Sequence, residues 1–135
     1  MIRLIKERFY SLIKGLKYNI TDNGTYNEAF PWLMLRLGNA SKLNSFNLEV
    51  NAISLTLDIF STYNGELEII EIVEDITNNL QKLVADMPEL LYAYQKTFKI
   101  LDDKSTGPVR KHGVVVYDFL LGQSQKEVPD NDTNE

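Results

Sequence analysis

The residues best suited to chemistry lie close together near the end of the sequence, between positions 102 and 113. Two adjacent carboxylates are followed by three bases and the only histidine of the chain: Asp102, Asp103, Lys104, Arg110, Lys111 and His112. A histidine beside carboxylates can serve in general acid–base catalysis, and Ser105 would add the nucleophile of a Ser-His-Asp triad. The segment has no strand-turn-helix elbow to hold a nucleophile, and adjacent aspartates at a strand end point apart. We therefore expect no catalytic site here.

The composition excludes several other kinds of site. The chain has no cysteine, which removes disulfides, thiolate zinc sites and cysteine nucleophiles. A single histidine also excludes three-histidine and His-Glu-x-x-His metal sites. The glycine-rich motifs that bind nucleotide phosphates are absent. We expect no metal and no cofactor, and we expect that the protein is not an enzyme.

Charge is distributed unevenly along the chain. The net charge is −5, which argues against a partner nucleic acid that is read by sequence. Bases gather in residues 1–17, whereas residues 58–75 contain acids and no base. This asymmetry is typical of solvated helix faces, and it also suits complementary patches on copies of one protein. The bases are Arg3, Lys6, Arg8, Lys14 and Lys17, the first four of them within the expected first helix, and the acids near the second helix are Glu66, Glu68, Glu71, Glu74 and Asp75.

The first half of the sequence predicts one helix and two strands. Apolar residues at helical spacing indicate a helix over 2–16 whose apolar stripe packs on a sheet. A surface loop is expected over 18–30, a strand over 32–37 and a polar connection over 38–47. The next strand, 48–61, changes its alternation near Ala52. Either a β-bulge there or a strand start near Asn51 would account for this change.

The second half predicts a long helix and a hairpin. The apolar stripe over 66–87 indicates a helix, with acids in its N-terminal half where the helix dipole favours them. Alternating patterns over 90–101 and 114–121 predict two strands, the first with Leu90, Tyr92, Tyr94, Phe98 and Ile100 on one face. The twelve residues 102–113 between them are expected to form a loop.

These elements predict an α+β fold with one domain. The expected order is α-β-β-α-β-β, with a four-stranded, mostly antiparallel sheet and two helices packed on one of its faces. The domain covers 1–122, and the polar, acidic segment 123–135 is expected to be a flexible tail. Without a signal sequence or an apolar spanning segment, we expect synthesis and folding in a reducing cytoplasm and no membrane partner.

Four stretches together resemble the tail-completion (tail terminator) proteins of long-tailed, non-contractile bacteriophages. These stretches are Phe30-Pro31-Trp32-Leu33, Leu57-Asp58-Ile59-Phe60-Ser61, Asn64-Gly65-Glu66-Leu67-Glu68, and Ile72 through Leu83. The resemblance covers residues 1–122 and includes the order of the elements. The family usually has an aromatic residue such as tryptophan before the serine. Here Phe60 precedes Ser61, which is a modest departure.

The resemblance implies a structural protein of the virion at the tail–neck junction, made in the cytoplasm of the host bacterium. Six copies would form a ring that caps the tail tube and joins it to the head or neck. The implied partners are other copies of the chain, the major tail tube protein and a neck or head-completion protein, with DNA only in non-specific transit. We expect the loop residues 102–104 and 110–112 to contact the tube. The bases of the first helix are candidates for subunit contacts, and the acids near the second helix are candidates for the lumen.

Three alternatives remain open. The first is a neck protein, a head-completion or connector component of the same kind of phage. The second is a monomeric cytosolic adaptor or inhibitor that binds a single protein. The third is an enzyme that acts through Asp102, Asp103 and His112.

Overall fold

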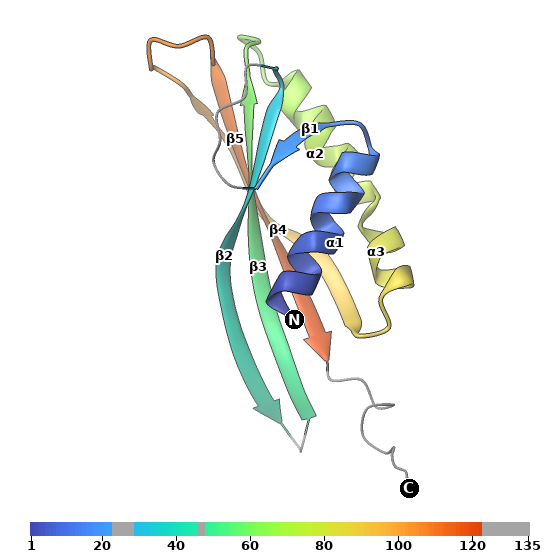
Figure 1. Cartoon of the computed structure of the whole chain (residues 1–135). Helices are drawn as coiled ribbons and strands as arrows, with labels where there is room; N and C mark the ends of the chain where they lie inside the picture. Colours follow the sequence, from blue (N-terminus) through green and yellow to red (C-terminus); the bar gives the residue numbers. More distant parts are fainter. Residues whose placement is uncertain (23–28, 46–47, 123–135) are drawn as a thin grey trace, which may run out of the picture.

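The computed structural model of the chain describes residues 1–22, 29–45 and 48–122 (Figure 1). The expected tail over 123–135 lies outside the described residues. In chain order the elements are α1 (Ile2–Gly15), β1 (Asn19–Thr21), β2 (Trp32–Ser45), β3 (Leu48–Ser61), α2 (Leu67–Asn78), α3 (Leu80–Asp86), β4 (Leu90–Asp102) and β5 (Lys111–Gly122).

The sheet has five strands in the order β1-β2-β3-β5-β4. The α+β class is as expected, but the four-stranded, mostly antiparallel sheet with element order α-β-β-α-β-β is wrong, because the sheet is five-stranded and mixed. The additional strand, β1, lies in the segment expected to be a loop and pairs parallel to the start of β2, with Asn19 opposite Trp32. Three residues are too few to show an alternating pattern, so only the pairing with β2 reveals this strand.

All three helices lie on the same face of the sheet (Figure 1). The first expected helix is present as α1, whereas the expected continuous helix over 66–87 is divided at Asn79. The Asn79 side-chain amide donates to the backbone oxygen of Asp75 at 2.7 Å, and its backbone N–H donates to Ile76 O at 3.0 Å. The bond to Ile76 spans three residues and closes a tighter turn than the α-helix, so α3 starts afresh at Leu80.

The bulge expected near Ala52 occurs in the neighbouring strand instead. The register between β2 and β3 shifts between Leu37 and Asn39, which leaves Gly38 as the extra residue. β3 is continuous from Leu48, so neither the bulge at Ala52 nor the start near Asn51 occurs. β2 continues past its bulge to Ser45, so the described part of the expected polar connection, residues 38–45, is strand. The resulting β2–β3 hairpin extends beyond the helices (Figure 1).

A second irregularity changes the face that the tyrosines of β4 occupy. The register between β4 and β5 shifts between Gln95 and Thr97. Phe98 is therefore opposite the buried Val115, whereas Tyr94 is opposite Asp118 on the other face. The expectation that Tyr92 and Tyr94 share a face with Phe98 and Ile100 is wrong, because one extra residue reverses the alternation.

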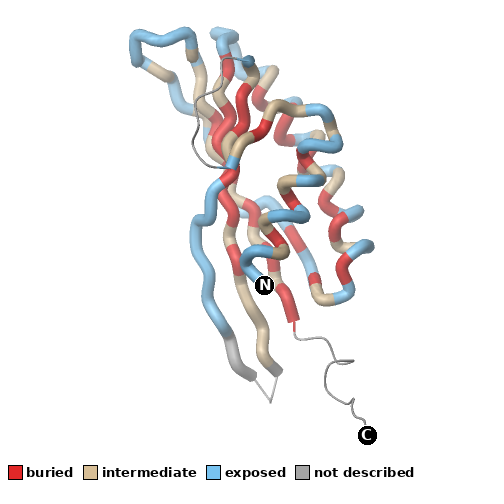
Figure 2. Tube along the Cα trace, viewed as in Figure 1, coloured by how far each residue is buried: buried red, intermediate tan, exposed pale blue. Residues whose placement is uncertain are grey.

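The core lies between the helices and one face of the sheet (Figure 2). The ring of Phe9 on α1 meets the rings of Tyr117 and Phe119 edge-on, at centroid distances of 5.1 and 5.2 Å. The Tyr117 hydroxyl lies 2.9 Å from Thr77 Oγ1, and burial raises the pKa of Tyr117 to about 12. The strands contribute Leu33, Leu35, Ile53, Leu55, Leu57, Ile59, Val115 and Leu121, and the helices contribute Ile5, Ile13, Ile69, Ile72, Val73, Ile76, Leu80 and Leu83.

One glycine sets how closely α2 approaches the sheet. A Cβ atom at Gly113 would lie 2.5 Å from Cγ2 of the buried Ile69. We expect Gly113→Ala to lower the free energy of unfolding by about 1–3 kcal/mol, because the branched side chain must shift within a packed core. Urea unfolding followed by circular dichroism measures the change. Gly107→Ala is the matched control, since its Cβ would meet only Ser105 Oγ, at 3.9 Å. Equal stability of the two variants would contradict this account.

Candidate functional site

The predicted contact loop is shorter and more ordered than the sequence indicates. β4 ends at Asp102 and β5 begins at Lys111, so the β4–β5 turn comprises residues 103–110. The Asp102 carboxylate accepts a hydrogen bond from Lys111 Nζ, which lowers the pKa of Asp102 and raises the pKa of Lys111. Next to this pair, the Asp103 N–H donates to Arg110 O at 2.9 Å. The two strands are therefore closed together at the base of the turn.

Two further hydrogen bonds hold the turn in place. The Ser105 N–H donates to Asp103 Oδ1 at 2.8 Å, and the resulting hydrogen bonds to Ser105 lower the pKa of Asp103. The Arg110 N–H donates to Ser61 O at 2.8 Å, which attaches the turn to the end of β3. The side chains of Lys104 and Arg110 are left exposed. Of the six predicted loop residues, these two are the best placed to contact a partner.

His112 belongs to a different site, on the sheet face that the helices do not cover. Its Nε2 lies 2.9 Å from Oδ1 of Asp58, a carboxylate that is 2% exposed. Arg36 donates to the same carboxylate through Nε, 2.7 Å from Oδ2, and through Nη2, 3.4 Å from Oδ1. An ionised carboxylate only accepts hydrogen bonds, so His112 carries a proton on Nε2. We call Arg36, Asp58 and His112 the Asp58 cluster.

Aromatic stacking continues the Asp58 cluster towards β2. The ring of Phe60 lies between those of His112 and Trp32, with centroid distances of 4.5 and 4.8 Å and interplanar angles of 19° and 27°. The Trp32 indole N–H donates to Thr21 Oγ1 on β1 at 3.0 Å. The stack therefore links four strands and limits the rotation of the histidine ring.

Opposing influences act on the pKa of Asp58. Burial alone would raise this pKa, but the hydrogen bonds and charges of His112 and Arg36 outweigh burial, and the pKa is lowered. The carboxylate stays ionised and is already satisfied by two donors. Such an arrangement holds the neighbouring strands β2 and β5 to β3.

A second carboxylate on the same face is satisfied in the same way. Asp118 accepts hydrogen bonds from Ser54 Oγ at 2.6 Å and from the Tyr94 hydroxyl at 3.1 Å, and Lys96 Nζ lies 3.7 Å away. The uncovered face thus carries two carboxylates whose partners belong to the sheet itself. Burying this face against another protein would leave neither charge without a partner.

The three candidate catalytic residues are not brought together. Asp102 pairs with Lys111, Asp103 with the backbone of Ser105, and His112 with Asp58. Within the described ranges no hydrogen bond links His112 to a serine or threonine hydroxyl. The described residues also contain no group of three histidine, aspartate or glutamate side chains arranged to hold a metal ion.

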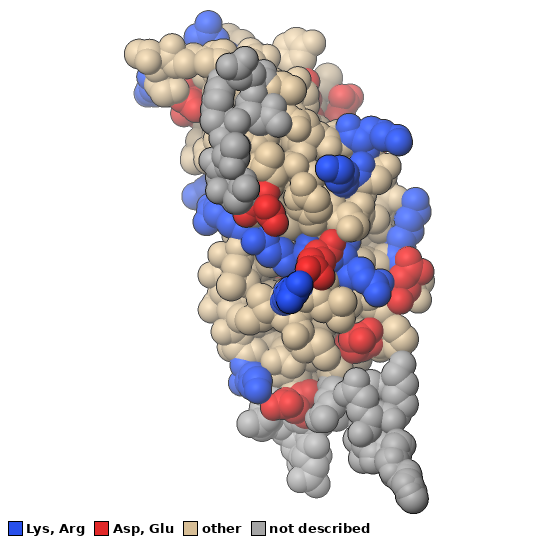
Figure 3. Space-filling model, viewed as in Figure 1, with Lys and Arg blue, Asp and Glu red and all other residues tan. Residues whose placement is uncertain are grey.

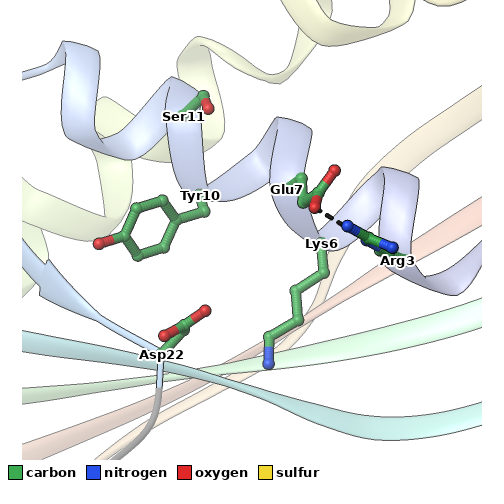
Figure 4. A pocket seen from close by; sticks show the side chains of 6 residues that line it. All are labelled: Arg3, Lys6, Glu7, Tyr10, Ser11 and Asp22. Atoms are coloured by element: carbon green, nitrogen blue, oxygen red, sulfur yellow. Dashed lines mark hydrogen bonds and ion pairs between the residues drawn. The ribbon is translucent and has the colours of Figure 1, made fainter. Parts of the chain in front are cut away.

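The bases of α1 do not form a single patch. Arg3 Nε lies 3.1 Å from Glu7 Oε2, and both residues line a hollow with Lys6, Tyr10, Ser11 and Asp22 (Figure 4). Lys14 Nζ lies 5.8 Å from the centre of the Tyr10 ring, whereas Arg8 lines a different hollow between α1 and α3. The face that carries α1 accordingly shows basic side chains interrupted by acidic ones (Figure 3).

The five predicted lumen acids divide into two groups. Glu68 accepts a hydrogen bond from Ser61 Oγ at 2.6 Å, and Asp75 accepts one from the Tyr18 hydroxyl at 2.7 Å. Burial, together with Asp75, raises the pKa of Tyr18 to about 12. The remaining acids, Glu66, Glu71 and Glu74, are exposed.

The Asp58 cluster is not predicted by the sequence patterns, which place Asp58 in the strand 48–61 and His112 in the loop 102–113. A usable signal was present, since each of the two charges has apolar neighbours in the sequence, in Leu35-Arg36-Leu37 and in Leu57-Asp58-Ile59. A charge in such a position needs a partner nearby.

No family model matches the chain, and no curated protein sequence matches it. Among the helices that the structure describes, none has both the length and the apolar composition needed to cross a membrane.

The Asp58 cluster predicts a pH-dependent contribution to stability. Because folding lowers the pKa of Asp58 below its ordinary 3.8, this contribution is present above that value and is lost as the pH falls through the folded pKa. We expect Asp58→Asn to lower the free energy of unfolding by about 1–3 kcal/mol at pH 7, and the difference from the parent to shrink below pH 3.8. Urea unfolding at pH 7, 5 and 3 measures this. Asp22→Asn, an exposed site, is the control, and a difference independent of pH would refute the account.

Proposed function

We propose that the chain is a structural virion protein resembling a phage tail terminator, whose six copies form a ring that caps the tail tube and joins it to the head or neck. The observation that carries the proposal is the position of the projecting segments. The β4–β5 turn and the β2–β3 hairpin project from opposite ends of the sheet, beyond the helices (Figure 1). A ring between a tube and a neck must meet a different partner at each end, and this subunit has a separate projecting segment for each.

The distribution of charge supports contacts between copies. None of the ion pairs formed within the described ranges joins a base of α1 to an acid of α2. Arg3 pairs with Glu7, and Glu68 and Asp75 accept hydrogen bonds within the chain. The remaining members of the two groups can pair across subunits, each exposed pair contributing no more than about 1 kcal/mol. A ring that closes through such head-to-tail contacts needs two different complementary patches on each subunit.

The exposed acids support a role in DNA transit. Phosphate is repelled by a wall of carboxylates, and Glu74 is the better candidate for the lumen, because Glu66 and Glu71 lie beside the exposed Tyr63 and Leu67, a surface suited to subunit contacts. Glu68 and Asp75 accept hydrogen bonds within the chain and contribute less to such a wall. In this proposal the ring lies at the tail–neck junction of the virion, and the protein has no catalytic role.

The state of association is tested first. We expect light scattering to give a mass six times the 15.5 kDa of one chain, either alone or after addition of the major tail tube protein of the same phage. A monomer under both conditions would refute the ring and favour the adaptor. A ring that binds the neck but has no effect on the tube would favour the neck protein.

The β4–β5 turn is then tested for capping. Replacing residues 103–110 by Asn-Gly should leave the chain folded, because it removes no core residue and keeps the pair between Asp102 and Lys111. We expect the variant to lose capping and to give tails of uncontrolled length by electron microscopy. The control changes Ser105 and Thr106 to alanine, which keeps the length and charge of the turn. Tails of normal length from the shortened variant would show that capping does not use this turn.

A further inference from the structure

A hollow between α1 and α3 has an apolar floor and a rim with two bases. It measures about 210 Å³ and is lined by Arg8, Ser11, Leu12, Lys82, Leu83 and Asp86. Leu83 is buried and Leu12 half-buried, whereas the two bases are exposed. Neither base forms an ion pair with another described residue, and with Asp86 the rim has one positive charge in excess. We call this hollow the α1–α3 groove.

An apolar projection lies at the other end of the helical layer. Tyr63 and Leu67 are 64% and 67% exposed, the highest values among the large apolar side chains that the structure describes. They stand together where the turn after β3 leads into α2, and both line a second hollow. Glu66 and Glu71 lie beside them and are exposed. Two neighbouring apolar side chains in water with charged residues around them are typical of a protein contact site.

We propose that Tyr63 and Leu67 of one copy pack into the α1–α3 groove of a second copy. Glu66 and Glu71 then lie next to Arg8 and Lys82 of that copy. This inference rests on the proposed ring, because it identifies the surfaces that join its subunits. Apolar burial provides most of the attraction, and the exposed charge pairs set the orientation.

The occupant of the groove is a second copy because the same chain carries both halves of a complementary pair. One half has an apolar projection with acids, and the other has an apolar floor with bases. The two halves cannot meet within one chain. Leu67 and Leu83 are separated by 16 residues of nearly continuous helix, which is roughly 24 Å at the rise of an α-helix. A contact between two different patches is head-to-tail and can close into a ring.

Cysteine cross-linking tests the contact directly, since the chain has no cysteine of its own. Leu67→Cys is placed in one chain and Ser11→Cys in a second chain that carries a mass tag. Both positions are exposed. We expect mild oxidation of the mixture to give the mixed disulfide at least tenfold faster than a control mixture of Leu67→Cys with Thr97→Cys, an exposed position on β4. Equal rates in the two mixtures would overturn the proposal.

Charge exchange then tests the orientation in the same assay. Adding Glu66→Lys and Glu71→Lys to the Leu67→Cys chain should slow cross-linking at least tenfold. Adding Arg8→Glu and Lys82→Glu to the Ser11→Cys chain as well should restore the rate, because both patches are then reversed. Lys99→Glu with Lys104→Glu makes the same change of net charge at exposed sites outside the groove and should not restore it. Failure of the matched reversal to restore the rate would overturn the proposed pairing.

The contact and the ring can fail separately. A six-fold mass by light scattering without the mixed disulfide would overturn this contact and leave the proposed function standing. The mixed disulfide from a chain that neither forms a ring nor caps tubes would support the contact and refute the proposed function.

Discussion

The carboxylate of Asp58 imposes the strongest local constraint on the sheet. It is almost fully buried in the central strand, and it stays ionised because β2 supplies Arg36 and β5 supplies His112. An unpaired charge at this depth would cost several kcal/mol, so the two neighbouring strands have to be in register with β3. The aromatic stack through Phe60 then ties β1 and β2 to the same point. On the opposite face, the apolar side chains of these strands form the core with the helices.

This constraint also explains how a sheet can leave one face uncovered. A bare face usually needs a layer of helices or a second sheet because of its apolar residues. Here the face carries two carboxylates, and each is satisfied by side chains of neighbouring strands. Both carboxylates therefore have their partners within the sheet. Another protein could bury the same face without leaving either charge unpaired.

The two ends of the molecule are formed by different elements. One end brings together the β4–β5 turn, the start of α2 and the exposed pair of Tyr63 and Leu67. The other end consists of the projecting β2–β3 hairpin (Figure 1). A subunit with unlike ends and unlike sides suits an assembly in which every neighbour is different. The proposed ring is such an assembly, since tube, neck and adjacent copies would each meet their own surface.

The elements with long regular patterns can be predicted from the sequence. The stripe of α1 and the buried face of β5 follow from periodicity over many residues, because each repeat adds to the same signal. The continuity of β3 does not follow from it, because the alternation changes near Ala52 whereas the strand runs unbroken from Leu48. In contrast, β1, the break at Asn79 and the bulges at Gly38 and in β4 are set by contacts that form when the chain folds. These depend on a single pairing, one amide hydrogen bond or one extra residue, which leave no period in the sequence. His112 lies 54 residues from Asp58, and no local pattern links two groups at that separation. The pair exists because antiparallel pairing of β3 with β5 places them side by side, and burial then makes the hydrogen bond necessary.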